Sequence, residues 1–127
     1  MEKRSRQRDA IYADLCSRKD HPTADMVYES VKKDFPSIGI ATVYRNLRAM
    51  ADSGKIRVLH TENADHFDAD ISNHCHLYCR NCKSLLDFEM ISVDSLVAEA
   101  KDEYNSSVDS VTLIFNGLCE DCYKKAN

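Results

Sequence analysis

The chain has 127 residues, of which 43% are hydrophobic and 30% are charged, so we expect a folded protein of one or two small domains rather than a disordered chain. No apolar run is long enough to cross a membrane, and no apolar stretch follows the charged residues 1–8 as it would in a signal peptide. We therefore expect a cytoplasmic protein with no membrane partner. In that compartment, six cysteines indicate metal or redox chemistry rather than a disulfide framework.

The two halves of the chain differ in charge. Residues 1–60 carry twelve Lys and Arg against eight Asp and Glu, a net charge of +4, whereas residues 61–127 carry five against thirteen, a net charge of −8. Phosphate contacts need only a local basic face, so the overall charge of −4 does not exclude DNA. The asymmetry predicts two modules with different partners.

Three helical patterns occupy the first part of the chain. A helix is predicted from about residue 3 to 18, and Asp20-His21-Pro22 ends it. Thr23 is a typical N-cap for a second helix, whose apolar positions are Ala24, Val27, Val31 and Phe35. A third helix is predicted from about residue 40 to 52, and Ser53-Gly54 ends it. Its expected buried stripe consists of Ile40, Val43, Leu47 and Met50.

Two short predicted strands, residues 55–60 and 66–69, follow around a polar turn. Three helices and a hairpin form a winged helix-turn-helix, a common DNA-binding module. The third helix would then lie in the major groove, where arginines reach phosphates or guanine edges. The alternative is an ordinary solvated helix face. The candidate DNA contacts are Arg8, Thr42, Tyr44, Arg45, Arg48 and Arg57.

The C-terminal half is small, and its predicted core is thin. Strands are expected at residues 77–79, 84–88 and 107–115, and a helix is expected from about 93 to 104 with Val93, Leu96, Ala100 and Tyr104 on one face. Exposed strand edges and the apolar helix predict a homodimer in which two copies complete one sheet. The predicted fold class is α+β, with a winged-helix DNA-binding domain (residues 1–69) and a small α/β metal-binding dimerisation domain (residues 70–127).

Two C-x2-C pairs, Cys79 with Cys82 and Cys119 with Cys122, supply the four thiolates of a closed tetrahedral zinc site. The alternative is two unrelated cysteine pairs. A structural zinc would provide the stability that the thin core cannot.

A second metal site is indicated by His74 and His76, which are two residues apart and point to one side of a strand. Asp68 and Asp87 flank them in sequence, and imidazoles with carboxylates suit ferrous iron, manganese or zinc. Surface histidines beside acids are the alternative. Cys75 would point away from the histidines and is expected in the core.

At this point the chain resembles the ferric uptake regulator (Fur) superfamily over nearly its whole length. The matching motifs are Arg6-Gln7-Arg8, His21-Pro22-Thr23-Ala24-Asp25, Ala41-Thr42-Val43-Tyr44-Arg45-Asn46-Leu47, His66-Phe67-Asp68, His74-x-His76-x2-Cys79-x2-Cys82, Leu86-Asp87-Phe88 and Gly117-x-Cys119-x2-Cys122. The resemblance implies a homodimeric repressor with a structural zinc on the four cysteines and a regulatory metal at the hinge between the domains. The ligands that it implies for the regulatory metal are His21, Asp68, His74, His76 and Asp87.

Within this family, iron sensors usually carry glutamates where Asp68 and Asp87 stand, whereas the peroxide-sensing branch (PerR) carries aspartates. The resemblance to that branch implies that peroxide reacts at bound ferrous iron and that His21 or His74 is oxidised, which releases a palindromic A·T-rich operator. Manganese would bind the same site without peroxide sensitivity. The segment Tyr44-Arg45-Asn46 looks more like the general Fur pattern, so operator preference stays open.

Other functions remain open at this stage. One is a repressor that senses the level of iron or another metal without peroxide chemistry. Another is a zinc-thiolate redox switch, although a redox C-x2-C usually occurs once, near a βαβ pattern. A metalloenzyme such as a hydrolase is disfavoured, because no base or nucleophile is evident beyond the metal ligands. We therefore expect a protein that is not an enzyme.

Overall fold

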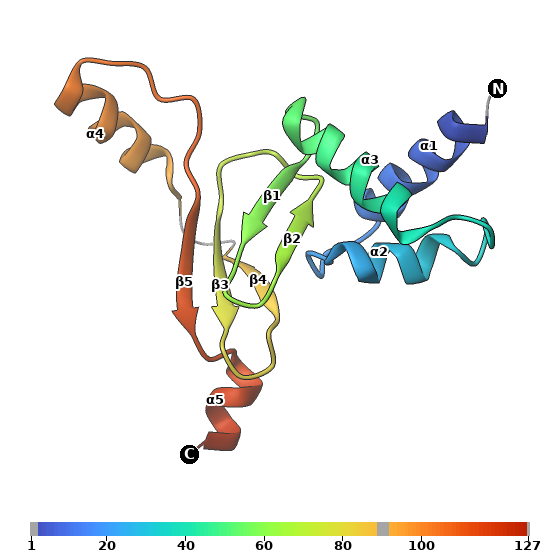
Figure 1. Cartoon of the computed structure of the whole chain (residues 1–127). Coiled ribbons are helices and arrows are strands. Elements are labelled where there is room, and N and C mark those ends of the chain that lie inside the picture. The colour runs from blue at the N-terminus through green and yellow to red at the C-terminus, as the bar shows by residue number, and fades with distance from the viewer. Residues whose placement is uncertain (1–2, 89–91, 127) are drawn as a thin grey trace. The chain divides into compact units, whose positions relative to one another are not determined.

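The computed structural model describes residues 3–88 and 92–126, and the chain divides into two compact units, Met1–Ile71 and Ser72–Asn127 (Figure 1). They are called the N-terminal and C-terminal units below. In the residues described, no helix combines the length and apolar character needed to cross a membrane.

The N-terminal unit consists of three helices followed by a hairpin, shown from blue to green in Figure 1. The helices are α1 (Lys3–Cys16), α2 (Ala24–Val31) and α3 (Ile40–Asp52). The strands β1 (Arg57–His60) and β2 (Asp65–Asp68) pair antiparallel, with Leu59 opposite His66. This order is that of a winged helix, as the sequence predicts.

Local signals place the helix boundaries as expected. Thr23 has extended backbone dihedrals, and its hydroxyl accepts a hydrogen bond from the Met26 N–H at 3.4 Å, so the predicted N-cap of α2 is confirmed. Gly54 follows α3 with φ at +80°, a conformation that glycine adopts without strain.

The core of the N-terminal unit lies where the three helices and the hairpin meet. It consists of Ile11, Leu15, Ala24, Val27, Val31, Ile38, Val43, Leu47, Met50, Ile56 and Phe67. The expectation that Ile40 is buried is wrong, because its side chain is 37% exposed. Ile40 is the first residue of α3, and Ile38, just before the Gly39 N-cap, is buried in the core.

The C-terminal unit contains a three-stranded sheet of order β4-β3-β5. Strands β3 (Cys75–Cys79) and β4 (Leu85–Phe88) pair antiparallel around the first cysteine turn, as predicted, and β5 (Leu113–Gly117) runs parallel to β3. The predicted strand over residues 107–115 is wrong in its first part. Leu113, the first residue of β5, pairs with Cys75, the first residue of β3, so the strand begins later than predicted.

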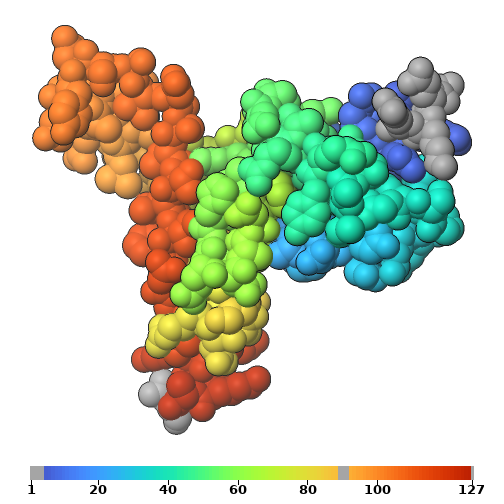
Figure 2. Space-filling view, viewed as in Figure 1, coloured from blue at the N-terminus to red at the C-terminus, as the bar shows by residue number. Residues whose placement is uncertain are grey.

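Two helices complete the C-terminal unit: α4 (Asp94–Tyr104) and the short α5 (Glu120–Ala126), which the sequence analysis did not predict. No residue of α4 is buried, and its Leu96 and Tyr104 are 45% and 78% exposed. The orange atoms of α4 stand out from the rest of their unit in Figure 2. Of the apolar face predicted for this helix, Val93 at the N-cap is buried, whereas Leu96 and Tyr104 are open within one chain.

Candidate metal centres and nucleic-acid interface

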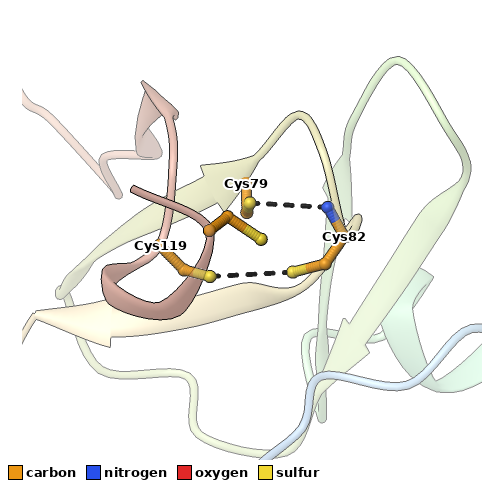
Figure 3. Close-up of side chains that lie close together, drawn as sticks. Cys79, Cys82 and Cys119 are labelled. Carbon is orange, nitrogen blue, oxygen red and sulfur yellow. Dashed lines mark hydrogen bonds between the residues drawn. The ribbon is translucent and has the colours of Figure 1, made fainter. Parts of the chain in front are cut away.

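Four cysteines gather at one end of the C-terminal sheet. Cys79 ends β3, and Cys82 lies in the turn to β4. Cys119 immediately precedes α5, and Cys122 lies in its first turn. Their sulfur atoms all lie within 4.8 Å of one another, and Figure 3 shows three of the thiols turned toward a common centre. None of the four forms a disulfide.

The spacing of these sulfurs fits a zinc ion. Two thiolates of a tetrahedral zinc site, each about 2.3 Å from the metal, lie about 3.8 Å apart. The Sγ atoms of Cys82 and Cys119 are 3.8 Å apart. Cys79, Cys119 and Cys122 also form a small core cluster with Leu118, so a metal bound here would lie beside this packed cluster.

Backbone and hydroxyl groups favour thiolates at the first cysteine pair. Backbone N–H groups of Cys119 and Cys82 donate to the Cys79 sulfur and lower the pKa of this thiol to about 6. The Ser84 hydroxyl, 3.1 Å from the Cys82 sulfur, lowers the pKa of that thiol. At Cys119 the N–H of Cys122 acts in the same direction, but hydrogen bonds with the neighbouring thiols and burial raise the pKa to about 11. A divalent cation would favour the thiolate form at all four positions.

Three nitrogen and oxygen ligands meet in the C-terminal unit. The Nε2 atoms of His74 and His76 each lie 3.2 Å from the same Asp87 oxygen, and Asp87 is the cross-strand partner of His76. The His74 Nδ1–H donates to the backbone carbonyl of Ser72 at 2.8 Å, which leaves Nε2 directed toward Asp87. Two ligands about 2.1 Å from one ion, at a right angle, lie about 3 Å apart, so this group fits part of a metal site.

The N-terminal unit holds a pair of candidate ligands. His21 Nε2 lies 3.2 Å from Asp68 Oδ2, and both side chains are largely buried. The other Asp68 oxygen accepts a hydrogen bond from the Asp70 N–H at 2.9 Å. His21 has φ at +50°, a left-handed conformation that costs a non-glycine residue on the order of 1–2 kcal/mol. The surrounding structure must therefore stabilise this backbone.

The structure thus places the five predicted regulatory ligands in two groups, His21 with Asp68 and His74 with His76 and Asp87. Cys75 is fully buried on the opposite side of β3 from His76, which confirms the expectation that it belongs to the core. The hydrogen-bonding residues Ser72 and Ser84 were not predicted. The only sequence feature that could have indicated these two serines is that each lies two residues from a candidate ligand.

Some of the predicted DNA contacts line an open groove of about 540 Å³ between α1 and α3. Arg8, Thr42 and Arg45 lie there, and an Arg45 guanidinium nitrogen donates to the Thr42 hydroxyl at 3.2 Å. The groove also contains Gln7 and Asn46, which the predicted contacts omitted. Asn46 donates to the Thr42 carbonyl at 2.8 Å. Its position next to Arg45 on the polar face of the helix could have identified it as a groove residue from the sequence.

The other predicted DNA contacts lie elsewhere on the N-terminal unit. Tyr44, 47% exposed, lines a separate groove with Asp25 and Asp65, whose negative charges disfavour phosphate. Arg48 pairs with Asp65 at 3.3 Å, which ties α3 to the hairpin. Arg57 is the first residue of β1. The arginines with the clearest access to a phosphate backbone are therefore those of the α1–α3 groove.

The sequence profile of the ferric uptake regulator family matches residues 2–116. The chain belongs to the ferric uptake regulator family. The family is made up of transcriptional regulators, which are not enzymes.

The Fur-family relatives found include peroxide regulators. The peroxide-responsive repressor PerR of Staphylococcus saprophyticus is 35% identical over 120 residues, which cover 94% of this chain and 81% of that protein. The crystal structure of the Campylobacter jejuni peroxide stress regulator superposes with a TM-score of 0.79 at 27% identity, covering 94% of this chain and 91% of that one. The Fur protein of Helicobacter pylori has the same TM-score at 21% identity, covering 93% and 80%, and supports the shared fold.

Proposed function

We propose that this chain is a metal-dependent, DNA-binding transcriptional repressor that senses hydrogen peroxide. The observation that carries the proposal is the set of metal ligands, which comprises three imidazoles and two aspartates in two preformed groups. The relatives named as peroxide regulators support the same function.

A structural zinc ion is proposed on Cys79, Cys82, Cys119 and Cys122. The 3.8 Å sulfur separation and the lowered pKa of Cys79 support it. The zinc would hold α5 against the end of β3 and make up for the few buried apolar residues in this unit.

A regulatory ferrous or manganous ion is proposed to take ligands from both units. His21 and Asp68 offer two donors, and His74, His76 and Asp87 offer three, so neither group alone fills the coordination shell of such an ion. An ion bound by both groups would stabilise one arrangement of the two units, and DNA bound by that arrangement would in turn raise the metal affinity.

Ferrous iron held by His21, Asp68, His74, His76 and Asp87 would supply redox chemistry toward hydrogen peroxide. Overall, one peroxide oxygen would be added to a ligand histidine and the other would leave as water, so that the ring is oxidised and the peroxide reduced. His21 or His74 would then gain one oxygen on its ring and lose its ability to act as a ligand. The carboxylates and the Ser72 carbonyl fix the directions of these rings, so the susceptible positions are set by the chain itself. The oxidation would occur once per chain, so no enzymatic turnover is proposed.

A homodimer on a palindromic A·T-rich operator is proposed as the repressing form. Exposed Leu96 and Tyr104 on α4, and half-exposed Leu86 and Phe115 on the sheet, provide apolar surface for a second copy. Two N-terminal units related by a two-fold axis would place two α3 helices on symmetric half-sites.

The metal requirement is tested by His21→Ala, with His60→Ala as the matched control because His60 is an exposed histidine of the hairpin. We expect His21→Ala to abolish Mn²⁺-dependent binding to operator DNA while zinc content and dimer mass stay unchanged. The control should behave as the wild type. Mn²⁺-dependent binding that survives in His21→Ala would contradict the ligand assignment.

One observation favours a second candidate, a zinc-thiolate redox switch. Cys82 is an exposed member of the cysteine group, and the nearby Ser84 hydroxyl lowers its pKa. In that case peroxide would release zinc before any histidine is modified. Following zinc release and histidine mass together during oxidation distinguishes the two functions.

A further inference from the structure

Three consecutive residues of β2 hold the backbone and the ring of His21. His66 Nδ1 lies 2.7 Å from the His21 carbonyl oxygen, and this hydrogen bond is buried. The Phe67 N–H donates to the Pro22 carbonyl at 2.9 Å, and Asp68 lies 3.2 Å from the His21 ring. All of these contacts lie within the N-terminal unit.

The direction of the His66 hydrogen bond is fixed by chemistry. A carbonyl oxygen only accepts, so Nδ1 carries a proton and donates it. Among the described residues, Nε2 is buried without a hydrogen-bond partner. The imidazole, only 4% exposed, is therefore held by its bond to the His21 carbonyl.

The position that His66 holds is an unfavourable one. His21 lies between Asp20 and Pro22 in a left-handed conformation, with φ at +50°. A chain free to relax would leave this conformation and turn the His21 ring away from Asp68. A buried donor on the carbonyl of the same residue opposes that rotation.

We propose that His66 is a positioning residue for the regulatory metal: it fixes the His21 backbone so that the His21 ring stays beside Asp68. This inference rests on the proposed role of His21 as a ligand. His66 is not among the residues whose donor atoms could gather around one ion, so the role assigned to it is to hold His21 rather than to bind the metal.

Two substitutions separate this role from direct ligation. His66→Asn places an N–H donor where Nδ1 stands and removes the ε position, whereas His66→Gln places its polar atoms at the ε position and removes the δ donor. Positioning predicts that His66→Asn keeps most of the Mn²⁺ affinity and that His66→Gln loses about tenfold or more. Direct ligation through Nε2 predicts the opposite order and would overturn the proposal.

The experiment is a titration of the full-length, zinc-loaded chain with Mn²⁺, in which the free ion is counted by electron paramagnetic resonance. His60→Gln is the matched control, because the His60 ring bonds to Asp65 and lies outside the residue 21–22 contacts. Zinc content and the thermal midpoint of each metal-free variant are measured beside the titration. A role in stability alone would lower the midpoint and leave the Mn²⁺ affinity of the folded variants unchanged, which would overturn the proposal.

His21→Ala separates the inference from the function on which it rests. If the wild type binds Mn²⁺ and His21→Ala does not, the ligand role holds and the His66 variants decide the inference; a wild type that binds no Mn²⁺ overturns both. Should His66→Gln fail to fold, the ¹⁵N shifts of the wild-type His66 ring give a second test. A proton on Nδ1 supports the donor role that the proposal requires, and an Nδ1 that carries no proton overturns it.

Discussion

At the scale of single residues, Cys79 has no exposed surface, and backbone N–H groups donate to its sulfur. We predict that Cys79→Ser releases the zinc and unfolds the C-terminal unit. A structural zinc contributes on the order of 10 kcal/mol of binding free energy, which is comparable with the whole stability of a small domain. Zinc content and circular dichroism measure the loss.

Cys16→Ser is the matched control for this prediction, because Cys16 is exposed and lies outside the cysteine group. It should keep its zinc and its thermal midpoint. A Cys79→Ser protein that stays folded without zinc would contradict the structural role of the site.

The pH response of Asp65 is a second prediction at this scale. Hydrogen bonds from His60 first, and then from Arg48, hold the pKa of this carboxyl below its ordinary value of 3.8. Since the pKa is lower in the folded state, the stabilisation is fully present above pH 3.8 and is lost as the pH falls through the folded pKa.

Carbon NMR of the Asp65 carboxyl tests this directly. At about pH 4, near the ordinary value for aspartate, a larger fraction of the Asp65 carboxyl should be ionised in the wild type than in His60→Ala. Equal ionisation in both proteins would assign the pKa shift to another cause.

At the scale of elements, α3 carries the main DNA-contact prediction. Arg45 is exposed in the α1–α3 groove beside Arg8, and its guanidinium donates to Thr42. We predict that Arg45→Ala weakens operator binding by about 1–3 kcal/mol if the side chain reads a base, without altering Mn²⁺ affinity. Binding is measured by fluorescence anisotropy at several salt concentrations.

Arg80→Ala is the matched control, since it removes an exposed arginine from the turn of the C-terminal unit. Its operator affinity should equal that of the wild type. Equal losses in both variants would indicate a general charge effect rather than a contact made by α3.

Elements with strong local signals were predictable from the sequence. Interactions between residues close in sequence determine the Thr23 cap, the limits of α3 and the turn between β3 and β4. Two features depend on tertiary partners instead. β5 begins only where β3 begins, and α5 is a short helix whose one buried residue is a cysteine of the second C-x2-C pair.

The candidate metal sites also divide into a part that short-range sequence signals predict and a part that depends on tertiary contacts. Cysteine spacing predicts the four-thiol group, because each turn of two intervening residues brings its pair together. The geometry of His21 was not predictable from spacing, because it depends on a left-handed backbone and on contacts from β2, which is 45 residues away at His66. Tertiary hydrogen bonds of this kind leave no periodic pattern in the sequence.

At the scale of the whole molecule, one metal ion is proposed to join the ligand group of the N-terminal unit to that of the C-terminal unit. Each unit would provide only some of the ligands, so the ion would link the two units. Loss of the ion would then abolish DNA binding without unfolding either unit. Oxidation of a single ligand histidine would then be enough to release the operator, while the cysteine-bound zinc keeps the C-terminal unit folded.

The most direct test uses the protein loaded with ferrous iron and bound to a palindromic A·T-rich operator. A stoichiometric amount of hydrogen peroxide is added, DNA binding is followed, and peptide masses are read afterwards, with manganese-loaded protein as the control. The account predicts that only the iron form releases DNA and that one oxygen appears on the peptide carrying His21 or His74. Persistent binding with both histidines unmodified would contradict peroxide sensing and favour a repressor that responds to metal level.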